Sequence, residues 1–346
     1  MGSSSSGFLA RVMAASQFPG PTAASVQAIA AGDRATAGRR PLASGRLAGI
    51  AVAVACLTPL ATAPTSAAET VTDGRGRTVE ITDTSRIVSV GGTVTEILYA
   101  LGHGDNIVAV DSTSLYPPEA LKTKDDVGYL RSLAPEGVLA EAPTLIVAEG
   151  DVGPPPAVDV LTSSTVPMVI IDNARTPEAV ESRIRFIAGV IGEKDKGEAL
   201  ARHVQDGFDR LAAARAKVGK PVRVMFVLSL RNGQPMVAGS GTAADAAIRL
   251  AGAENVAAGV EGYKGMTEEA IVEAAPDAVV MMAHAQASAS ADEVFAMPAF
   301  RMVPAAEGKR LIKVDGLALL GFGPRTPEAA LELCHALDPA CTADAP

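Results

Sequence analysis

The sequence contains few of the residues that build metal cages and nucleophilic catalytic sites. Its four histidines are scattered along the 346 residues, at His103, His203, His284 and His335. No multi-His metal cage is therefore visible. The chain also has no G-x-S-x-G motif, and no Ser-His-Asp set stands out, so the pattern of a hydrolase is missing. We predict that the protein is not an enzyme.

Positive charge is also scarce once the N-terminal segment is set aside. Residues 1–68 contain five Arg and one Asp, a net charge of +4, whereas the whole chain has a net charge of −9. The rest of the chain therefore carries −13. An acidic chain without a basic stripe is a poor nucleic-acid binder, so no nucleic-acid partner is expected.

Long, strongly apolar runs are missing from the N-terminal region. The run from Leu47 to Cys56 is Ala-rich and too short to span a membrane, which takes roughly 20 strongly apolar residues. Arg39, Arg40 and Arg46 precede this run, and Ser66-Ala67-Ala68 supplies small residues for cleavage. These features predict an N-terminal extension and signal peptide over residues 1–68, and hence export.

Cysteine occurs only three times. Cys56 follows Ala53-Val54-Ala55, which lacks the Leu usual at the third position before the Cys of a lipoprotein site, so lipid anchoring is not expected. Cys334 and Cys341 lie seven residues apart near the C-terminus. Two interpretations stay open for this pair: a disulfide in an oxidising compartment, or two free thiols.

What the chain does contain is one stretch that occurs twice, over residues 128–147 and 262–280. In each copy a Gly-Tyr loop carrying a cation leads into a short helix, and a proline then precedes an apolar strand. Glu136 and Glu269 occupy equivalent positions, each seven residues before that proline. An internal repeat at this distance predicts two similar lobes. We expect the two Gly-Tyr loops to face each other across a ligand cleft.

The first predicted lobe covers residues 69–175. A hairpin is expected over 71–81 from its alternating pattern. Buried strands are expected at Arg86–Val90 and Ile107–Val110, and the helix between them is predicted to open with a capping box at Thr93–Glu96. Strand, helix and strand in this order indicate a βαβ unit.

The second predicted lobe covers residues 220–346 and repeats this scheme. Val222–Leu228 is a continuous apolar strand, and Asn232-Gly233 suits a tight hairpin turn. Gly239-Ser240-Gly241 then leads to a helix capped by Thr242; this stretch is a weak match to a dinucleotide motif. The N-terminus of that helix is expected to attract an anion.

Residues 176–219 are predicted to be helical except near Gly192. Apolar residues recur at helical spacing in two stripes. The second helix, over residues 193–218, would span about 37 Å. A helix of this length between two lobes would form a stiff connection.

These motifs resemble the periplasmic binding proteins in which one helix joins the lobes, and within them the haem-binding components of bacterial haem-uptake ABC transporters. The resemblance covers residues 79–337. It rests on four motifs: Thr93 to Gly102, Gly128-Tyr129-Leu130-Arg131 with Glu136-Gly137, Gly239 to Asp245, and Leu320 to Arg325. The second and fourth are specific for the haem branch, whereas cobalamin and siderophore binders share the first.

The resemblance implies an α/β fold of two Rossmann-like lobes joined by one long α-helix, with the ligand cleft between the lobes. It also implies little hinge motion, a location in the periplasm, and one haem delivered to an inner-membrane ABC permease. We expect a monomer. The cargo would be free haem or haem passed on by an outer-membrane haem receptor system, and a siderophore or cobalamin is the alternative ligand of the same fold.

Tyrosine chemistry suits this cargo. Ferric iron is a hard cation, so a phenolate oxygen is a suitable axial ligand, and tyrosine is a known haem ligand. An unperturbed tyrosine titrates at about pH 10, and the iron and a neighbouring cation both favour the phenolate. Family members carry a Tyr-x-Arg motif that matches Tyr129 and Arg131, so Tyr129 is the predicted axial ligand. Tyr116, before two prolines, is a less favoured alternative.

Further residues are predicted to contact the haem. Tyr263, the repeat partner of Tyr129, is expected to stack on or hydrogen-bond to it, and Lys264 would pair with a propionate or be a solvated surface lysine. His284 follows a predicted strand, where α/β strands deliver residues to a crevice; it is a propionate partner, a sixth ligand or an ordinary loop histidine. Some relatives have a histidine near Arg231, and its absence here argues against a second histidine-bound haem. The predicted haem-binding set is Arg131, Tyr263, Lys264, His284, Gly239, Ser240 and Arg231.

Glu136 and Glu269 are assigned a different role. Related binding proteins present one such glutamate per lobe to arginine pockets on the permease, so the resemblance implies docking contacts at both positions. The alternative is that each carboxylate simply stabilises the N-terminal dipole of its helix.

Overall fold

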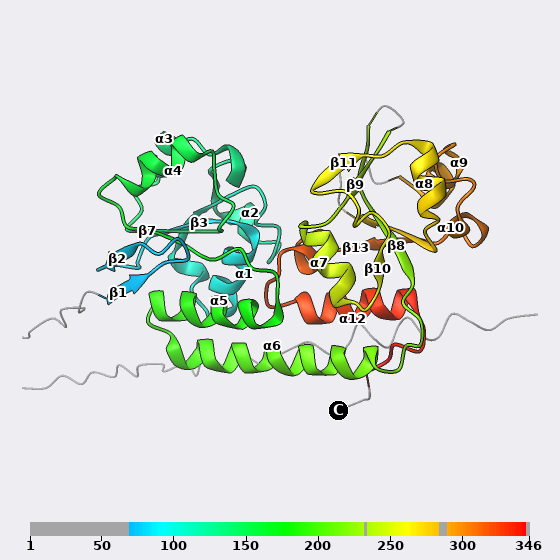
Figure 1. Ribbon diagram of the computed structural model, residues 1–346. Coiled ribbons are helices and arrows are strands. Elements are labelled where there is room, and N and C mark those ends of the chain that lie inside the picture. The colour runs from blue at the N-terminus through cyan, green and yellow to red at the C-terminus, as the bar shows by residue number, and fades with distance from the viewer. Residues whose placement is uncertain (1–68, 232–233, 284–288, 344–346) are drawn as a thin grey trace, which may run out of the picture. The chain divides into compact units, whose positions relative to one another are not determined.

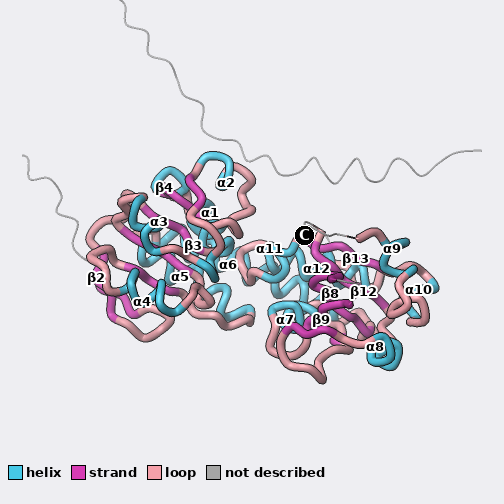
Figure 2. Tube along the Cα trace, turned by 90° about the horizontal axis from the view of Figure 1, so that it is seen from above, coloured by secondary structure: helices cyan, strands magenta, loops and turns pink. Residues whose placement is uncertain are grey.

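Strands and helices alternate along most of the chain (Figure 1). The computed structural model describes residues 69–231, 234–283 and 289–343. These residues belong to one compact unit, residues 62–346. Figure 2 shows two groups of strands, one containing β3 and β4 and the other β8, β9, β12 and β13, each bordered by helices. The α/β class predicted from the sequence is confirmed.

The first lobe is built on a five-stranded parallel sheet with the order β5-β4-β3-β6-β7. Its strands are β3 (Ile87–Val90), β4 (Ile107–Val110), β5 (Asp125–Asp126), β6 (Leu145–Ala148) and β7 (Met168–Ile170). The chain runs from β3 out to β5 and returns to β6 on the other side of β3. In open α/β sheets, ligands bind at the carboxyl ends of the strands beside such a reversal.

Short elements complete this lobe. The predicted hairpin is confirmed as β1 (Glu69–Thr72) paired with β2 (Thr78–Ile81). The helices are α1 (Gly92–Ala100), α2 (Ala120–Thr123), α3 (Pro135–Ala140), α4 (Pro155–Thr162) and α5 (Pro177–Val190), with 3-10 turns η1 (Gly104–Asn106) and η2 (Leu130–Ser132).

The predicted capping box at Thr93–Glu96 is wrong. Helix α1 begins at Gly92, and the Gly91 that precedes it has no side chain to cap it. A carboxylate from the end of β6 does so instead, since Glu149 Oε1 accepts a hydrogen bond from Thr93 N at 2.8 Å. The capping group therefore lies 56 residues away in the sequence, so a local sequence pattern could not predict it.

The second lobe contains a six-stranded sheet with the order β11-β9-β8-β12-β13, and β10 pairs with β8. Its strands are β8 (Arg223–Arg231), β9 (Gln234–Ala238), β10 (Glu254–Asn255), β11 (Tyr263–Gly265), β12 (Ala278–Met282) and β13 (Leu311–Val314). The helices are α7 (Ala243–Leu250), α8 (Glu268–Ala274), α9 (Ala291–Ala296), α10 (Pro304–Glu307), α11 (Gly316–Leu320) and α12 (Thr326–Leu337). Strands β8 and β9 form the predicted hairpin, and Thr242 caps α7 as expected, accepting from Asp245 N.

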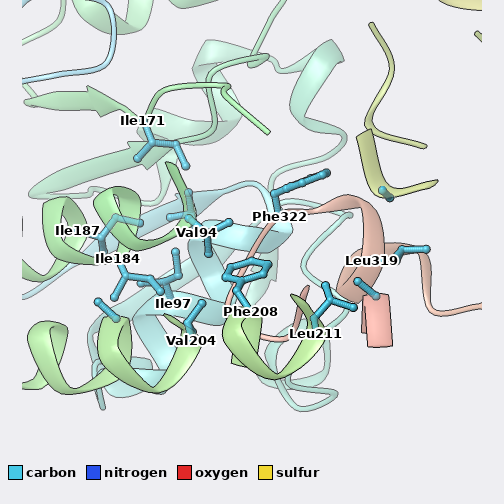
Figure 3. Close-up of a cluster of buried hydrophobic side chains, with 14 of the residues drawn as sticks. Val94, Ile97, Ile171, Ile184, Ile187, Val204, Phe208, Leu211, Leu319 and Phe322 are labelled. Atoms are coloured by element: carbon cyan, nitrogen blue, oxygen red, sulfur yellow. The ribbon is translucent and has the colours of Figure 1, made fainter. Parts of the chain in front are cut away.

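One long helix, α6 (Lys194–Arg215), runs beneath both lobes (Figure 1). Its buried face belongs to a hydrophobic cluster that also includes residues of α1, α5 and the segment before α12. Figure 3 shows Phe208 of α6 between Val94 and Ile97 on one side and Leu319 and Phe322 on the other. This core continues from one lobe to the other and does not mark where either lobe ends. The lobe boundaries predicted at residues 175 and 219 therefore stay a prediction.

Polar contacts join the lobes above this core. The Arg325 guanidinium donates to Glu96 Oε2 from Nε at 3.0 Å and from Nη2 at 2.9 Å, and Glu96 is only 4% exposed. Glu96 was expected to serve a cap, and that expectation is wrong. The ring of Tyr116 packs under the same guanidinium, and the ring centroid lies 3.7 Å from the central guanidinium carbon. Arg183 Nη1 donates to the Phe322 carbonyl at 2.7 Å.

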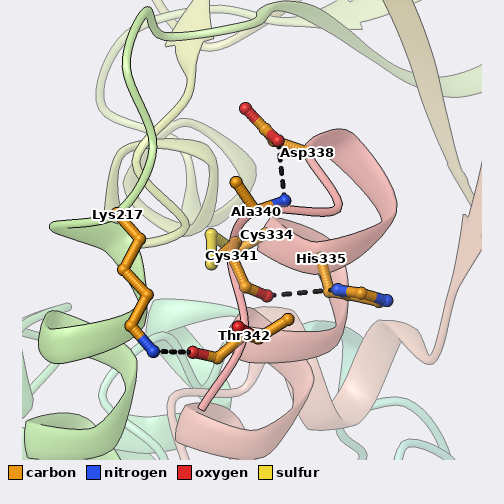
Figure 4. The surroundings of a disulfide bond; sticks show 7 residues. All are labelled: Lys217, Cys334, His335, Asp338, Ala340, Cys341 and Thr342. Carbon is orange, nitrogen blue, oxygen red and sulfur yellow. Dashed lines mark hydrogen bonds between the residues drawn. A yellow bond between two sulfur atoms is a disulfide. The ribbon is translucent and has the colours of Figure 1, made fainter. Parts of the chain in front are cut away.

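The C-terminal segment is attached to α12 and α6. Cys334 and Cys341 form a disulfide, which Figure 4 shows together with its surroundings. His335 Nδ1 lies 3.1 Å from the Cys341 carbonyl oxygen, and Lys217 Nζ donates to the Thr342 carbonyl at 2.8 Å. The segment after α12 is thereby fastened to the end of the inter-lobe helix.

Candidate functional site

The glycines of the two Gly-Tyr loops share a backbone conformation. Gly128 has φ +89° and Gly262 has φ +74°, in the left-handed region that residues with a Cβ rarely adopt. Both tyrosines that follow these glycines are partly exposed, Tyr129 at 44% and Tyr263 at 38%. The sequence repeat thus corresponds to a repeated turn that presents a phenol.

Tyr129 belongs to a chain of three polar side chains. Arg131 donates one hydrogen bond from Nη1 to the Tyr129 hydroxyl and another from Nη2 to Asp151 Oδ2. Burial lowers the pKa of Arg131, but the Asp151 carboxylate and the Tyr129 oxygen raise it by more, so the pKa lies above its ordinary value. The guanidinium is therefore a permanent cation beside the phenol.

Tyr263 has a different environment. It lies on β11, where it is paired with Ala238 of β9, and its hydroxyl faces Ala244 N and Thr242 at the start of α7. Desolvation raises the pKa of Tyr263 above 10, although the charges of Arg175 and Arg131 act in the opposite direction. The two tyrosines of the repeated loops therefore have different surroundings, and Tyr263 stays a neutral phenol.

A small polar cavity of about 70 Å³ includes Arg131 in its wall. Residues of both lobes line this cavity. The first lobe contributes acidic and basic side chains, and the second lobe contributes the segment before α12. Its walls include Thr93, Arg131, Glu149, Asp151, Asp172, Arg175, Arg183, Ala243, Leu320, Gly321 and Phe322. Of the predicted site residues, Arg131 is in this wall.

Glu149 is the most perturbed acid of this cavity. Burial raises the pKa of Glu149 to about 7, and the negative charges of Asp151 and Asp111 add to this effect, while the hydrogen bond from Thr93 N opposes it. The wall of the cavity therefore holds a carboxyl group that titrates well above the range of an ordinary glutamate.

Arg175, Glu149 and Asp151 were missed from the sequence. Arg175 Nη1 lies 3.4 Å from the Gly241 carbonyl oxygen, so its charge lies between the lobes near Tyr263. Glu149 and Asp151 follow β6, and Arg175 follows β7. The rule that ligands bind beyond the carboxyl ends of parallel strands would have indicated all three.

The other predicted contact residues lie on or near β9 and β11. Lys264 is exposed on β11. Ser240 N and Ser240 Oγ both donate to the Val260 carbonyl, at 2.7 and 3.0 Å, and Gly239 N donates to the Gly262 carbonyl at 2.8 Å. His284 falls outside the described residues, and so does the side chain of Arg231.

Glu136 and Glu269 occupy the equivalent positions that the repeat predicted. Glu136 lies in the first turn of α3 and Glu269 in the first turn of α8. Both side chains are exposed. Each helix begins a few residues after its Gly-Tyr loop.

Two further observations bear on the class of site. Within the described ranges, no cluster of three or more His, Cys, Asp or Glu side chains is arranged to hold a metal ion. None of the helices in this part of the chain is long and apolar enough to cross a membrane.

Comparison with known protein families identifies the family of this chain. The model of the family described as periplasmic binding protein matches residues 87–316. The chain belongs to this family. Its function is therefore that of a transport binding protein rather than an enzyme, and family membership implies export from the cytoplasm.

Solved structures are similar to this binding protein over about three quarters of the chain. The periplasmic heme-binding protein RhuT from Roseiflexus sp. RS-1, in apo form, is 34% identical with a TM-score of 0.71, covering 75% of this chain and 100% of that one. The periplasmic heme-binding protein BhuT in complex with two hemes is 35% identical with a TM-score of 0.70, covering 74% and 99%. The two-lobed fold with a ligand cleft is thereby confirmed.

More distant relatives have other descriptions. An uncharacterized ABC transporter substrate-binding lipoprotein, YvrC of Bacillus subtilis (strain 168), is 26% identical over 278 residues, which cover 78% of this chain and 85% of the relative. A vitamin B12-binding protein of Pectobacterium carotovorum subsp. carotovorum (strain PC1) is 26% identical over 254 residues, which cover 73% and 88%.

Proposed function

We propose that this binding protein takes up one ferric haem in the cleft beside Tyr129 and delivers it to the permease of an ABC transporter in the inner membrane. The observation that carries the proposal is the exposed Tyr129 phenol held by the Arg131 cation. It occurs in a chain that is 34–35% identical to periplasmic heme-binding proteins of the same fold.

The chemistry of the two loops supports an asymmetric site. The oxygen of Tyr129 is the iron ligand, because a cation at hydrogen-bonding distance stabilises the phenolate that a hard ferric ion prefers. The neutral phenol of Tyr263 stacks on the porphyrin or donates a hydrogen bond to it. Arg175 pairs with a propionate, since a guanidinium fits a carboxylate with two parallel hydrogen bonds.

Other predicted contacts complete the proposal. Lys264, Gly239 and Ser240 are the proposed contacts from the second lobe, and His284 and Arg231 are further candidates. Glu136 and Glu269 are the proposed permease contacts, which their exposure at equivalent helix starts supports.

Cobalamin is the second candidate ligand, and the 26% identity to a vitamin B12-binding protein favours it. A siderophore is a third ligand class for the same fold. The Tyr-x-Arg arrangement favours haem over both, because it offers a phenol oxygen beside a guanidinium to an open iron coordination site.

Haem titration of the mature protein tests the proposal. We expect about one equivalent of ferric haem to bind and to give a high-spin spectrum with a phenolate-to-iron charge-transfer band. Tyr129→Phe should abolish this band, because among the described residues Tyr129 is the phenol whose oxygen accepts a hydrogen bond from a guanidinium. Titration with cyanocobalamin under the same conditions should give no saturable change.

Matched variants make the outcome decisive. Tyr116→Phe removes the phenol that packs under Arg325, and we expect it to keep the band. Loss of the band in this variant and its retention in Tyr129→Phe would reverse the ligand assignment. Saturable binding of cobalamin without binding of haem would overturn the proposed cargo.

A further inference from the structure

Asp151 occupies a position from which it controls the orientation of Arg131. Its carboxylate accepts a hydrogen bond from one terminal nitrogen of the guanidinium, and the other terminal nitrogen donates to Tyr129. A guanidinium is planar, so fixing one nitrogen fixes the direction of the other. The carboxylate and the phenol are thus coupled through one rigid group.

The loop that carries Asp151 is fastened to the segment that carries Arg131. Gly153 N donates to the Leu130 carbonyl at 2.9 Å, and Leu133 N donates to the Gly153 carbonyl at 3.0 Å. These two backbone hydrogen bonds are made by Leu130 and Leu133, which lie on either side of Arg131 in the sequence. The relative position of the two loops is therefore set by the backbone and not by the ion pair alone.

Buried side chains hold the same two loops together. Val152, next to Asp151, is 5% exposed and belongs to a hydrophobic cluster that includes Leu130 and Leu133. On the outer side, Arg75 donates to the carbonyl of Gly150 at 3.3 Å. Asp151 thus projects from a packed loop, while the side chain of Arg131 is long and half exposed. The rigid partner of the pair is the aspartate.

An unanchored arginine would lose this direction. Arg131 has several rotatable bonds, and ordering such a side chain costs conformational entropy. Asp151 meets this cost before any ligand arrives, which is the general way in which preorganisation increases affinity.

We propose that Asp151 is a positioning residue for the ligand tyrosine: by anchoring Arg131 it holds the guanidinium against the Tyr129 oxygen and so sets the strength of the bond from that oxygen to the bound iron. This inference rests on the proposed function. It goes beyond the Tyr-x-Arg motif, because Asp151 lies 20 residues away from Arg131 in the sequence.

A double-mutant cycle in haem binding tests it. Asp151→Ala should weaken haem binding about tenfold, equivalent to about 1.4 kcal/mol, and should move the phenolate-to-iron band to lower energy, because the phenolate loses its donor. Arg131→Ala should produce the same band shift. Adding Asp151→Ala to Arg131→Ala should change neither affinity nor band further, since the aspartate acts through the arginine.

Control variants separate positioning from charge and from folding. Asp159→Asn removes a negative charge from an exposed position on α4 and should leave affinity and band unchanged. Asp151→Leu keeps roughly the size of the side chain but offers no acceptor to Arg131, and it serves if the alanine variant fails to fold. Additive effects in the cycle, or an Asp151→Ala or Asp151→Leu protein identical to Asp159→Asn, would overturn the proposal.

A measurement without haem distinguishes this failure from failure of the proposed function. In 15N NMR of the apo protein, the guanidinium signals of Arg131, identified by their loss in Arg131→Lys, should show hindered rotation that Asp151→Ala abolishes. Freely rotating Arg131 in the unmodified protein would overturn the positioning role whatever the cargo. Hindered rotation in a protein that takes up no haem would overturn the proposed function, and with it the role of Asp151 toward iron.

Discussion

At the scale of single residues, Glu149 combines a structural and an electrostatic role. It caps α1 through Thr93 N and lies in the wall of the cleft cavity. The cap favours the carboxylate, whereas burial and two neighbouring acids favour the neutral form. Burial and the neighbouring acids have the larger effect, so the pKa of Glu149 rises from its ordinary value of 4.5 to about 7.

This balance predicts how stability depends on pH. Between its ordinary pKa of 4.5 and the folded value of about 7, the folded protein holds a proton on Glu149 that the unfolded chain has lost. Raising the pH through this window therefore reduces stability, by roughly 3 kcal/mol in total. Glu149→Gln keeps an oxygen acceptor for Thr93 N and removes the charge, so the variant should gain stability relative to the unmodified protein as the pH rises.

Urea denaturation of both proteins at pH 5 and pH 8 measures this difference. The gain should be largest at pH 8 and mostly absent at pH 5. A difference between the two proteins that stays constant with pH would show that Glu149 is ionised throughout and that burial does not govern it.

The residue scale also shows what the sequence reveals about the site. Tyr129 and Arg131 are two residues apart, so a local motif could identify both, and the structure brings their side chains together. Asp151 and Arg175 reach the same cleft from other strand ends, and no local spacing links them to the tyrosine. Topology supplies that link, because the carboxyl ends of the parallel strands β5, β6 and β7, which precede Tyr129, Asp151 and Arg175, lie at the same edge of the sheet.

At the scale of elements, the seam between α1 and the segment before α12 is the main polar connection of the lobes. Arg325 contacts Glu96, Asp315 and the ring of Tyr116. Burial raises the pKa of Glu96 by more than Arg325 lowers it. Glu96 was predicted to cap its own helix, since the sequence pattern of a capping box is local. Its real partner lies 229 residues away.

Removal of the arginine should therefore be costly. Arg325→Ala leaves the buried carboxylate of Glu96 without its cation, and breaking such a pair costs about 3–5 kcal/mol. Arg185→Ala is the matched control, because Arg185 forms ion pairs with Glu181 and Glu198 at an exposed surface and should cost at most about 1 kcal/mol. Urea denaturation at pH 8 measures both. Equal losses for the two variants would contradict the structural role given to the seam.

At the scale of the whole molecule, the helix pattern and the repeat were sufficient to predict the architecture. The continuous apolar strands and the two apolar stripes of residues 176–219 appear as sheets and helices at nearly the predicted positions. The register of one lobe on the other could not be predicted. It depends on Phe208, Phe322 and the Arg325 seam, whose partners are distant in sequence.

Two lobes held by a common core present fixed surfaces to a partner. Figure 1 shows α3 and α8 on the side of the molecule away from α6, so Glu136 and Glu269 lie on a face that the inter-lobe helix leaves free. Charge reversal at both positions should impair transport with the cognate permease, because each acid would then repel the basic pocket that we propose to receive it. Haem affinity should be unchanged, since neither residue lines the cavity.

The experiment compares haem-stimulated ATP hydrolysis by the reconstituted transporter with equilibrium haem titration of the same variants. Reversal of Asp209 and Glu332, which are exposed on α6 and α12, changes the net charge equally and serves as the control. The reversed Glu136 and Glu269 protein should stimulate hydrolysis much less than this control at saturating haem. If both proteins stimulate equally, the permease approaches another face; if haem affinity falls in the Glu136 and Glu269 protein, the two glutamates belong to the ligand site instead.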